Sequence, residues 1–299
     1  MDFINKFYSE LVSGETISSV EKTGPAELKD RDLLVLEYLK DCNKVFEIGV
    51  GTGFNLSLSN ASFKGGIDIS KQAVELTKKI LLKNNMQEDQ MELYQRNIDA
   101  KDLSTSSNKY DGVMILETLE HLFDPIHALS ESNRILKNNG LLAISIPNIG
   151  YFESRFYLFK KGELNDFSGS GKILTEHIRF FGAKSIIKIL TISGFKVVRI
   201  KGVMKKNINK NYIMAPKHNT STKNQNKKIS KFFIFLTMTN ICKLLNKLFS
   251  LYKIFPSFFA VGLVIECVKV NEPTYKYNEA ISSNTANSER KYQINQTRD

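Results

Sequence analysis

An acidic residue followed by three glycines at alternating positions is the segment with the clearest capacity for chemistry. Glu47 follows a strand-like apolar run within VFEIGVGTGFNL, and the glycines are Gly49, Gly51 and Gly53. Glycine adopts backbone angles that other residues avoid and lets a ligand approach the main chain without meeting a side chain. At the carboxyl end of a buried strand, this pattern predicts a loop that binds a nucleotide-like molecule.

Two common nucleotide loops do not match this segment. A dinucleotide fingerprint needs glycine or alanine at position 54, where the chain has Phe54, and no Gly-Lys-Ser/Thr follows to make a Walker loop. The alternative is a glycine-rich turn that binds no ligand. The segment resembles the signature of class I S-adenosylmethionine (SAM)-dependent methyltransferases, in which an acid precedes Gly-x-Gly-x-Gly after the first strand.

Polar residues follow the next two predicted strands. Asp68 ends the segment FKGGID 21 residues after Glu47, a spacing at which a carboxylate can accept both hydrogens of a ribose diol. The alternative role for Asp68 is to cap the next helix, which Ser70 suits better. The resemblance implies that Asn97 and Asp99 lie in the loop that meets the adenine, with Asp99 accepting from its exocyclic amine. Asp99 can equally be a turn residue.

A second, separate segment strengthens the resemblance. The stretch YDGVMILETLEHLFDPIHALSESNRILKNNGLLAISIPN is similar to the fourth and fifth strands of ubiquinone-type and related small-molecule methyltransferases. It adds Glu117 to the expected SAM-binding residues. Glu117, Glu120 and His121 also match a divalent-metal site implied by ubiquinone-pathway O-methyltransferases. Relatives without metal carry the same string, and His121 can simply orient Glu120, so we assign no metal.

Methyl transfer to a hydroxyl group needs a base, and histidine is the natural candidate. Among the four histidines, we favour His177 because it borders the aromatic segment 151–171, which we expect to face the substrate. The alternative is that His177 only packs or caps a neighbouring element.

Strands alternate with helices from Lys44 to Asn148, which predicts an α/β, doubly wound parallel sheet. A sixth strand at 195–200 and an antiparallel last strand complete a mostly parallel, seven-stranded Rossmann-like sheet, and a basic helical insertion lies between these two strands. The expected organisation is an N-terminal helical lid at 1–40, a SAM-binding core at 41–202, a basic amphipathic insertion at 203–259, the last strand at 260–270 and a disordered tail at 271–299.

The insertion carries the excess charge of the chain. Its net charge is +11, and residues 201–255 contain twelve Lys and no Arg, Asp or Glu. At about 100° per residue, positions 237–253 place lysines opposite an apolar face, as in a helix lying in a membrane plane. The lysines interrupt any transmembrane window. Packing of this face on the sheet or on a second subunit is the alternative, but apolar residues at 232–236 and 255–259 favour a lipid or lipid-linked substrate.

Composition limits the remaining possibilities. The content of hydrophobic residues is 42%, which supports a substantial core. Three cysteines without CxxC spacing argue against a disulfide framework or a zinc site and fit a cytoplasmic protein. The first residues show no apolar segment of signal length.

The expected function is a cytoplasmic methyltransferase, membrane-associated through 229–255, that O-methylates a sugar or lipid-linked acceptor in cell-surface glycan synthesis. The sugar follows only from a general resemblance of the aromatic segment and the Phe-Pro-Ser-Phe-Phe ending to methyltransferases of glycan clusters. A quinone precursor or another small molecule is the alternative acceptor. An RNA methyltransferase is disfavoured because the basic insertion lacks arginine and its aromatic residues do not form a stacking platform interleaved with its lysines. A non-catalytic SAM-binding module is disfavoured because Glu47, the three glycines and Asp68 are all present. The sequence leaves the oligomeric state open.

Overall fold

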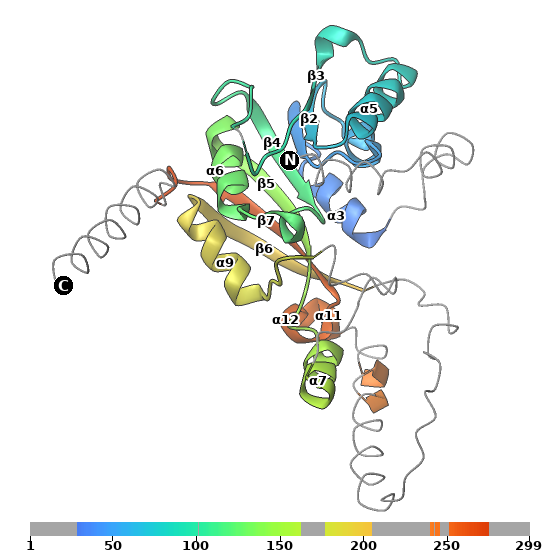
Figure 1. Ribbon diagram of the computed structural model, residues 1–299, viewed down its shortest axis with the longest axis vertical. Coiled ribbons are helices and arrows are strands. Elements are labelled where there is room, and N and C mark those ends of the chain that lie inside the picture. Colours follow the sequence, from blue (N-terminus) through green and yellow to red (C-terminus); the bar gives the residue numbers. More distant parts are fainter. Residues whose placement is uncertain are drawn as a thin grey trace, which may run out of the picture.

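The computed structural model describes residues 29–100, 102–162, 177–204, 240–241, 243–245 and 251–274. Seven strands form one sheet in the order β3-β2-β1-β4-β5-β7-β6 (Figure 1). β1 to β5 are parallel, and β7 runs antiparallel to both β5 and β6. The strands are β1 (Lys44–Ile48), β2 (Phe63–Asp68), β3 (Met91–Gln95), β4 (Tyr110–Leu116), β5 (Leu136–Pro147), β6 (Phe195–Val203) and β7 (Gly262–Lys269). This topology confirms the expected fold class.

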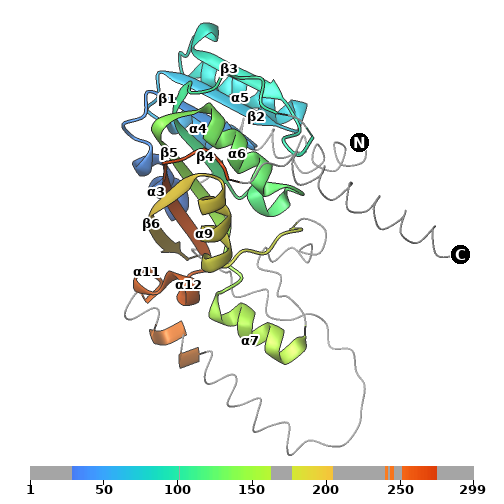
Figure 2. The same ribbon diagram turned by 90° about the vertical axis from the view of Figure 1, so that its left-hand side faces the viewer.

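Helices cover both faces of the sheet (Figures 1 and 2). The helices are α3 (Asp30–Tyr38), α4 (Phe54–Leu58), α5 (Lys71–Lys83), α6 (Pro125–Ile135), α7 (Phe152–Lys161), α9 (Ala183–Ile192), α11 (Leu251–Ile254) and α12 (Pro256–Phe259). Residues of α3, α4 and α5 share one hydrophobic core, and residues of α6 and α9 share the other. β1 supplies Val45 to the first core and Phe46 to the second, as a strand buried on both faces does.

Local capping signals set several helix boundaries. The Ser70 hydroxyl accepts a hydrogen bond from the Ala73 amide at 3.3 Å, and α5 spans Lys71–Lys83, the range over which the sequence predicts an amphipathic helix. The Asp124 carboxylate accepts from the His127 amide at 3.0 Å, with Pro125 at the first position of α6. These contacts satisfy amide groups that have no partner inside the helix.

The sequence predicts a helix that runs to Leu136 and is closed by Asn139 and Gly140, and the junction between α6 and β5 differs from the second part of this prediction. α6 ends at Ile135, and β5 begins directly at Leu136. The register with β4 shifts where Leu136 pairs with Tyr110 and Leu141 pairs with Gly112. Asn139 takes a positive φ of 61° within the extra residues, so it forms part of a β-bulge rather than a helix end.

Two regions beyond β5 also depart from the expectation. Part of the segment 151–171, expected without regular periodicity, forms α7, which ends at Gly162 with a φ of 72°. Near the other end of the fold, the Asn271 amide donates to Gly194 O and the Thr274 amide to Ile192 O. The first four residues of the predicted disordered tail are therefore held against the core, and the rest of that tail lies outside the described residues.

The described part of the insertion is short. Its aromatic residues Phe258 and Phe259 pack against Phe152 of α7, with ring centroids 6.0 and 5.9 Å away. These two side chains, which the sequence suggested for lipid contact, therefore belong to an aromatic cluster. Residues 1–28 and most of the predicted helix 237–253 lie outside the described residues. Among the residues described, we find no helix with the length and apolarity needed to cross a membrane.

Candidate functional site

A cavity of about 300 Å³ opens at the carboxyl edge of the parallel strands, at the lower end of the range for small-molecule sites. Its walls come from the ends of β1, β2 and β4 and from the loops that follow β3 and β4. The residues that line it are Ile48, Gly49, Gly51, Ile67, Asp68, Ile69, Arg96, Asn97, Ile98, Asp99, Leu116, Glu117, Thr118, His121, Leu122 and Phe123. In doubly wound sheets, ligands bind at this edge.

The three glycines of the loop have different structural roles. All have positive φ angles, of 80° at Gly49, 52° at Gly51 and 72° at Gly53. A Cβ on Gly49 would lie 2.5 Å from the Thr118 hydroxyl, and one on Gly53 would lie 2.5 Å from the Thr77 hydroxyl. A Cβ on Gly51 would meet nothing within 4 Å. Gly49 and Gly53 therefore allow close packing of the protein, whereas Gly51 leaves open space beside the cavity.

Glu47 precedes the cavity residue Ile48 in β1 but is not itself among the residues that line the cavity, and its residue exposure is only 1%. Its Oε2 atom accepts no hydrogen bond from the described residues. Burial raises the pKa of Glu47 well above its ordinary value, and the nearby Asp68 carboxylate adds to this effect. A buried carboxylate without a full set of partners suits a ligand that carries a positive charge.

Asp68 is held in place by the loop that it faces. Its Oδ2 accepts from the Gly51 amide and its Oδ1 from the Ser70 amide, both at 2.9 Å. Burial raises the pKa of Asp68, and these two hydrogen bonds oppose the rise. Each oxygen keeps a second lone pair, so the expected contact with ribose hydroxyls stays a prediction that the geometry permits.

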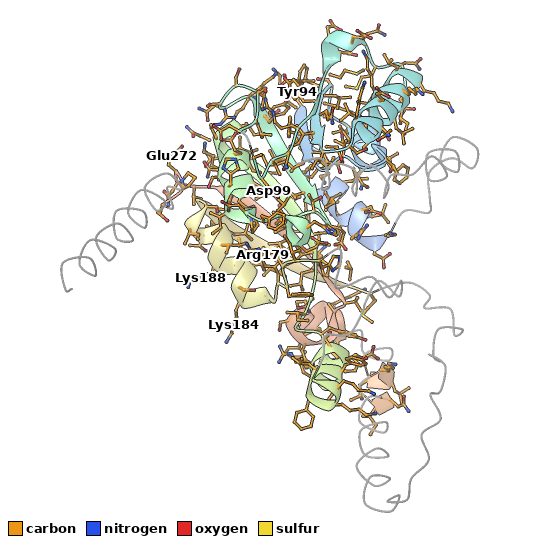
Figure 3. All side chains as sticks on the ribbon, viewed as in Figure 1. Tyr94, Asp99, Arg179, Lys184, Lys188 and Glu272 are labelled. Atoms are coloured by element: carbon orange, nitrogen blue, oxygen red, sulfur yellow. The ribbon has the colours of Figure 1, made fainter. Side chains whose placement is uncertain are left out.

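Asn97 and Asp99 line the cavity, and their side chains also form hydrogen bonds that hold the surrounding loops in place. The Asn97 side chain accepts from the Asp99 amide at 3.0 Å. The Asp99 carboxylate accepts from the amides of Phe123 at 3.1 Å and Asp124 at 2.8 Å, and Arg179 donates to the Phe123 carbonyl. Asp99 and Arg179 are labelled in Figure 3. Asp99 thus has the structural role that the sequence allowed, and its adenine contact stays a prediction.

Glu117 is fixed by two partners at the end of β4. It has a positive φ of 48°, which is uncommon for a residue with a side chain. Its Oε1 accepts from the Ser145 hydroxyl at 3.0 Å, and its Oε2 lies 2.9 Å from an Arg31 nitrogen. Sequence reasoning missed Arg31 because a lone cation in the first turn of a helix carries no motif.

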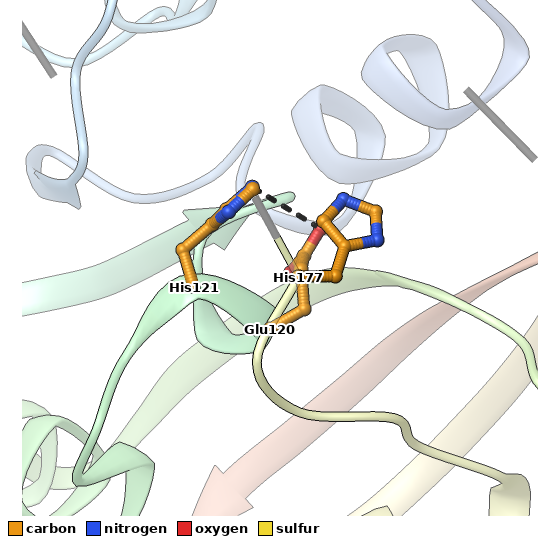
Figure 4. Close-up of side chains that lie close together, drawn as sticks. All are labelled: Glu120, His121 and His177. Atoms are coloured by element: carbon orange, nitrogen blue, oxygen red, sulfur yellow. Dashed lines mark ion pairs between the residues drawn. The ribbon is translucent and has the colours of Figure 1, made fainter. Parts of the chain in front are cut away.

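His177 lies beside two residues of the β4 loop, Glu120 and His121 (Figure 4). The His121 and His177 rings meet edge to face with centroids 4.8 Å apart, and His121 Nε2 lies 4.0 Å from the Glu120 carboxylate. The amides of Ile178 and Arg179 donate to the Glu120 carbonyl at 3.0 Å and fix this arrangement. His121 itself lines the cavity, so the structure adds a second imidazole next to the predicted base.

This cluster is also a set of donors that could hold a divalent cation. One ligand atom from each of Glu120, His121 and His177 lies within 4.8 Å of the others, and neither Glu120 oxygen accepts a hydrogen bond from the described residues. Burial raises the pKa of Glu120 well above its ordinary value, and the Glu117 carboxylate adds to the rise. One carboxylate and two imidazoles suit a transition metal. Glu117, which the resemblance placed in such a site, is instead bound by Ser145 and Arg31.

Comparison with known protein families shows which family the chain belongs to. Residues 21–200, more than half of the chain, match the family model described as a methyltransferase domain. The chain belongs to this methyltransferase family. The match confirms the resemblance to class I SAM-dependent methyltransferases and SAM as the expected cofactor. The open side of Gly51 and the incompletely paired Glu47 fit a charged nucleoside of this kind.

Individual relatives match a smaller part of this methyltransferase. The ubiquinone biosynthesis O-methyltransferase of Alkalilimnicola ehrlichii is 30% identical over 132 residues, which are 40% of this chain and 51% of that protein. The Haemophilus ducreyi protein of the same name is 26% identical over 110 residues, which are 35% and 45% of the two chains. The matches therefore span about half the length of these curated relatives.

Solved structures with a similar fold include a putative methyltransferase from Bacillus halodurans. It has a TM-score of 0.49 and 15% identity, and the match covers 80% of this chain and 99% of that one. The N-methyltransferase NodS from Bradyrhizobium japonicum, solved with S-adenosyl-L-homocysteine, has a TM-score of 0.44 and 16% identity, with 60% and 80% coverage.

Proposed function

We propose that this chain transfers a methyl group from SAM to a hydroxyl group of a small or lipid-linked acceptor, with His177 as the base. The observation that carries the proposal is the position of His177 against His121, a residue of the cavity wall. An imidazole is the side chain best suited to proton transfer near neutral pH. The open side of Gly51 and the Asp68 carboxylate leave room for the cofactor in the same cavity.

In this reaction the protein has to position the reacting groups and accept one proton. Bound SAM supplies an electrophilic methyl group on a sulfonium. The glycine loop, Asp68 and Glu117 position the reacting groups, and His177 accepts the proton of the acceptor hydroxyl as the oxygen forms its bond to the methyl carbon. Transfer of the methyl group would leave the electron pair of the broken carbon–sulfur bond on the sulfur atom, so the products would be a methyl ether, S-adenosylhomocysteine and a protonated imidazole at His177.

The acceptor is the finer part of the proposal. A sugar or lipid-linked acceptor of cell-surface glycan synthesis rests only on a general resemblance of the aromatic segment 151–171 and the Phe-Pro-Ser-Phe-Phe ending to methyltransferases of glycan clusters. The names of the curated relatives support small-molecule O-methylation and point to quinone precursors instead. A phenolic hydroxyl is more acidic than a sugar hydroxyl, so an imidazole base serves it more easily. Both acceptors remain within the proposed class of hydroxyl substrates.

The test is transfer of tritiated methyl from SAM into separated lipid, glycan and RNA fractions of a cell extract. We expect label in a lipid or glycan fraction and its loss on substitution His177→Ala, with SAM affinity unchanged by calorimetry. Label in RNA, or SAM binding without transfer to any fraction, would contradict the proposal. The latter result would identify a non-catalytic SAM-binding module.

A metal-assisted version of the same reaction is the second candidate. It is favoured by the two Glu120 oxygens that lack hydrogen-bond partners among the described residues. Glu120, His121 and His177 would hold the ion, which would lower the pKa of the acceptor hydroxyl as a Lewis acid. In that case His177 serves as a ligand rather than as the base.

A further inference from the structure

Exposed apolar side chains gather at the end of the molecule that carries α7, α11 and α12. Seven of the fifteen large hydrophobic residues exposed in the described part of the chain lie there: Leu158, Phe159, Ile241, Leu244, Leu245, Ile254 and Phe255. Both views place these segments at the end opposite β3 and α5 (Figures 1 and 2). We call these seven residues, together with Lys160, Lys161, Lys243 and Lys253, the distal surface.

This surface is attached firmly to the catalytic core. The Asn148 side chain, at the end of β5, donates to the carbonyls of Pro256 at 3.1 Å and Ala260 at 2.9 Å. These contacts fix α12, whose aromatic rings pack on Phe152 of α7. The distal surface therefore has a defined position relative to the SAM cavity.

An aromatic stripe on α7 runs out of this packed cluster into solvent. Phe152, Phe156 and Phe159 follow the spacing that places residues on one helix face. Phe152 is fully buried, and the centroid of its ring lies 6.4 Å from the centroid of the Phe156 ring. Phe159, in contrast, is 90% exposed. An aromatic side chain exposed to this extent at the end of a buried stripe indicates a surface that meets an apolar partner.

The charges around these apolar residues are positive. Lys160 and Lys161 end α7 and are exposed, as is Lys253. Lys243 contacts Glu153 at 2.6 Å and ties the helical residues near 243 to α7. Within α7, α11, α12 and the described residues between 240 and 245, Glu153 is the only acid. The surrounding sequence from 201 to 255 has the same bias, with twelve Lys and no acid.

We propose that the distal surface binds an anionic phospholipid bilayer. Leu158, Phe159 and the side chains at 254–255 enter the interfacial region. Lys160, Lys161 and Lys253 contact the phosphate head groups while their alkyl chains extend along the apolar surface, and Lys243 keeps its ion pair with Glu153. A second copy of the chain is a poor partner, because two lysine-rich faces repel each other. Nucleic acid is also a poor partner, because Phe258 and Phe259 are committed to the aromatic cluster and not available for base stacking.

The first experiment is co-sedimentation of the full chain with vesicles of phosphatidylglycerol and phosphatidylcholine in equal parts. The double substitution Lys160→Glu with Lys161→Glu should lower the partition coefficient by about tenfold or more, since each lysine contributes about 1 kcal/mol near an anionic surface. The matched control is Lys184→Glu with Lys188→Glu on α9 (Figure 3), which changes the net charge equally and should have no such effect. Equal losses in both variants would overturn the proposal.

The second experiment uses the absence of tryptophan from the sequence. The substitution Phe159→Trp places a single fluorophore on the distal surface, and Leu82→Trp places one on α5, at a position that is 41% exposed. Anionic vesicles should shift the emission of the first variant to the blue and leave the second unchanged. Equal shifts, no shift, or the same shift with pure phosphatidylcholine would overturn the proposal. Dissociation of an oligomer by Phe159→Ser would also overturn it, because the surface would then be a contact between copies. Neither experiment depends on methyl transfer.

Discussion

The Arg31 guanidinium lies 2.9 Å from Glu117 Oε2 and joins the first turn of α3 to the loop after β4. Glu117 lines the cavity and keeps a positive φ, with Ser145 bound to its other carboxylate oxygen. Arg31 therefore holds the side chain of Glu117, a residue that lines the cavity. Arg31 itself lies in α3, which precedes the glycine loop in the sequence. This contact joins the segment before β1 to the wall of the cavity.

The substitution Arg31→Met should weaken SAM binding by about threefold to tenfold, because Glu117 loses one of its two anchors and the ion pair is partly exposed. Isothermal titration calorimetry measures the change. Lys78→Met is the matched control, since Lys78 pairs with Glu88 on the surface. An unchanged affinity in Arg31→Met would show that Arg31 has no role in shaping the cavity.

The substitution Gly51→Ala should distinguish the effect of this residue on SAM binding from its effect on the stability of the fold. A Cβ there meets no protein atom within 4 Å, so the main cost to folding is the positive φ of 52°, about 1–2 kcal/mol. The same methyl group intrudes on the space beside the cavity and should weaken SAM binding by about tenfold or more. Gly162→Ala is the control, because Gly162 has a φ of 72° and equally open surroundings at the end of α7. Equal SAM affinities in the two variants would refute the assignment of Gly51.

Glu47→Gln should change the pH dependence of stability in a defined direction. Burial raises the pKa of Glu47 in the folded protein, so the folded state holds its proton more tightly than the unfolded state does. The wild type must therefore lose stability as the pH rises above the ordinary glutamate value of 4.5. The glutamine variant lacks this loss, so its melting temperature relative to the wild type should increase from pH 5 to pH 7.5.

Thermal unfolding at the two pH values measures this difference. Glu75→Gln, at an exposed site on α5, is the control and should follow the wild type at both. A constant difference between Glu47→Gln and the wild type would contradict the prediction. The same variant should bind SAM more weakly, since glutamine cannot become the carboxylate that a cationic ligand would favour at this buried position.

His177→Ala should lower kcat by about 10²- to 10⁴-fold if His177 is the base, with SAM affinity unchanged. Activity of the wild type should survive treatment with a chelator. Loss of activity on chelation with recovery on adding Mg²⁺, Mn²⁺ or Zn²⁺ would instead assign His177, Glu120 and His121 as metal ligands. Methyl-transfer rates before and after dialysis against EDTA distinguish the two cases.

The sequence determined the sheet, the glycine loop and the cofactor class, because these depend on local spacing. Alternating apolar runs, the cap at Ser70 and the acid before Gly49 act within a few residues, and the structure and the family match confirm what they predict for fold and cofactor. The helix end expected at Leu136 lies one residue from the observed end, but the closing role expected of Asn139 was wrong, because β5 begins at Leu136, which pairs with Tyr110 of β4.

Tertiary structure alone decided which side chains meet. Gly51 rather than Gly49 or Gly53 has open space on its Cβ side, since only folding brings Thr118 and Thr77 against the other two. His177 reaches Glu120 and His121 because backbone hydrogen bonds join segments more than fifty residues apart. Arg31 meets Glu117 in the same way, although the four strands β1 to β4 and the helices α4 and α5 lie between them in the sequence. Such contacts depend on how the chain closes on itself, and no periodicity in the sequence encodes them.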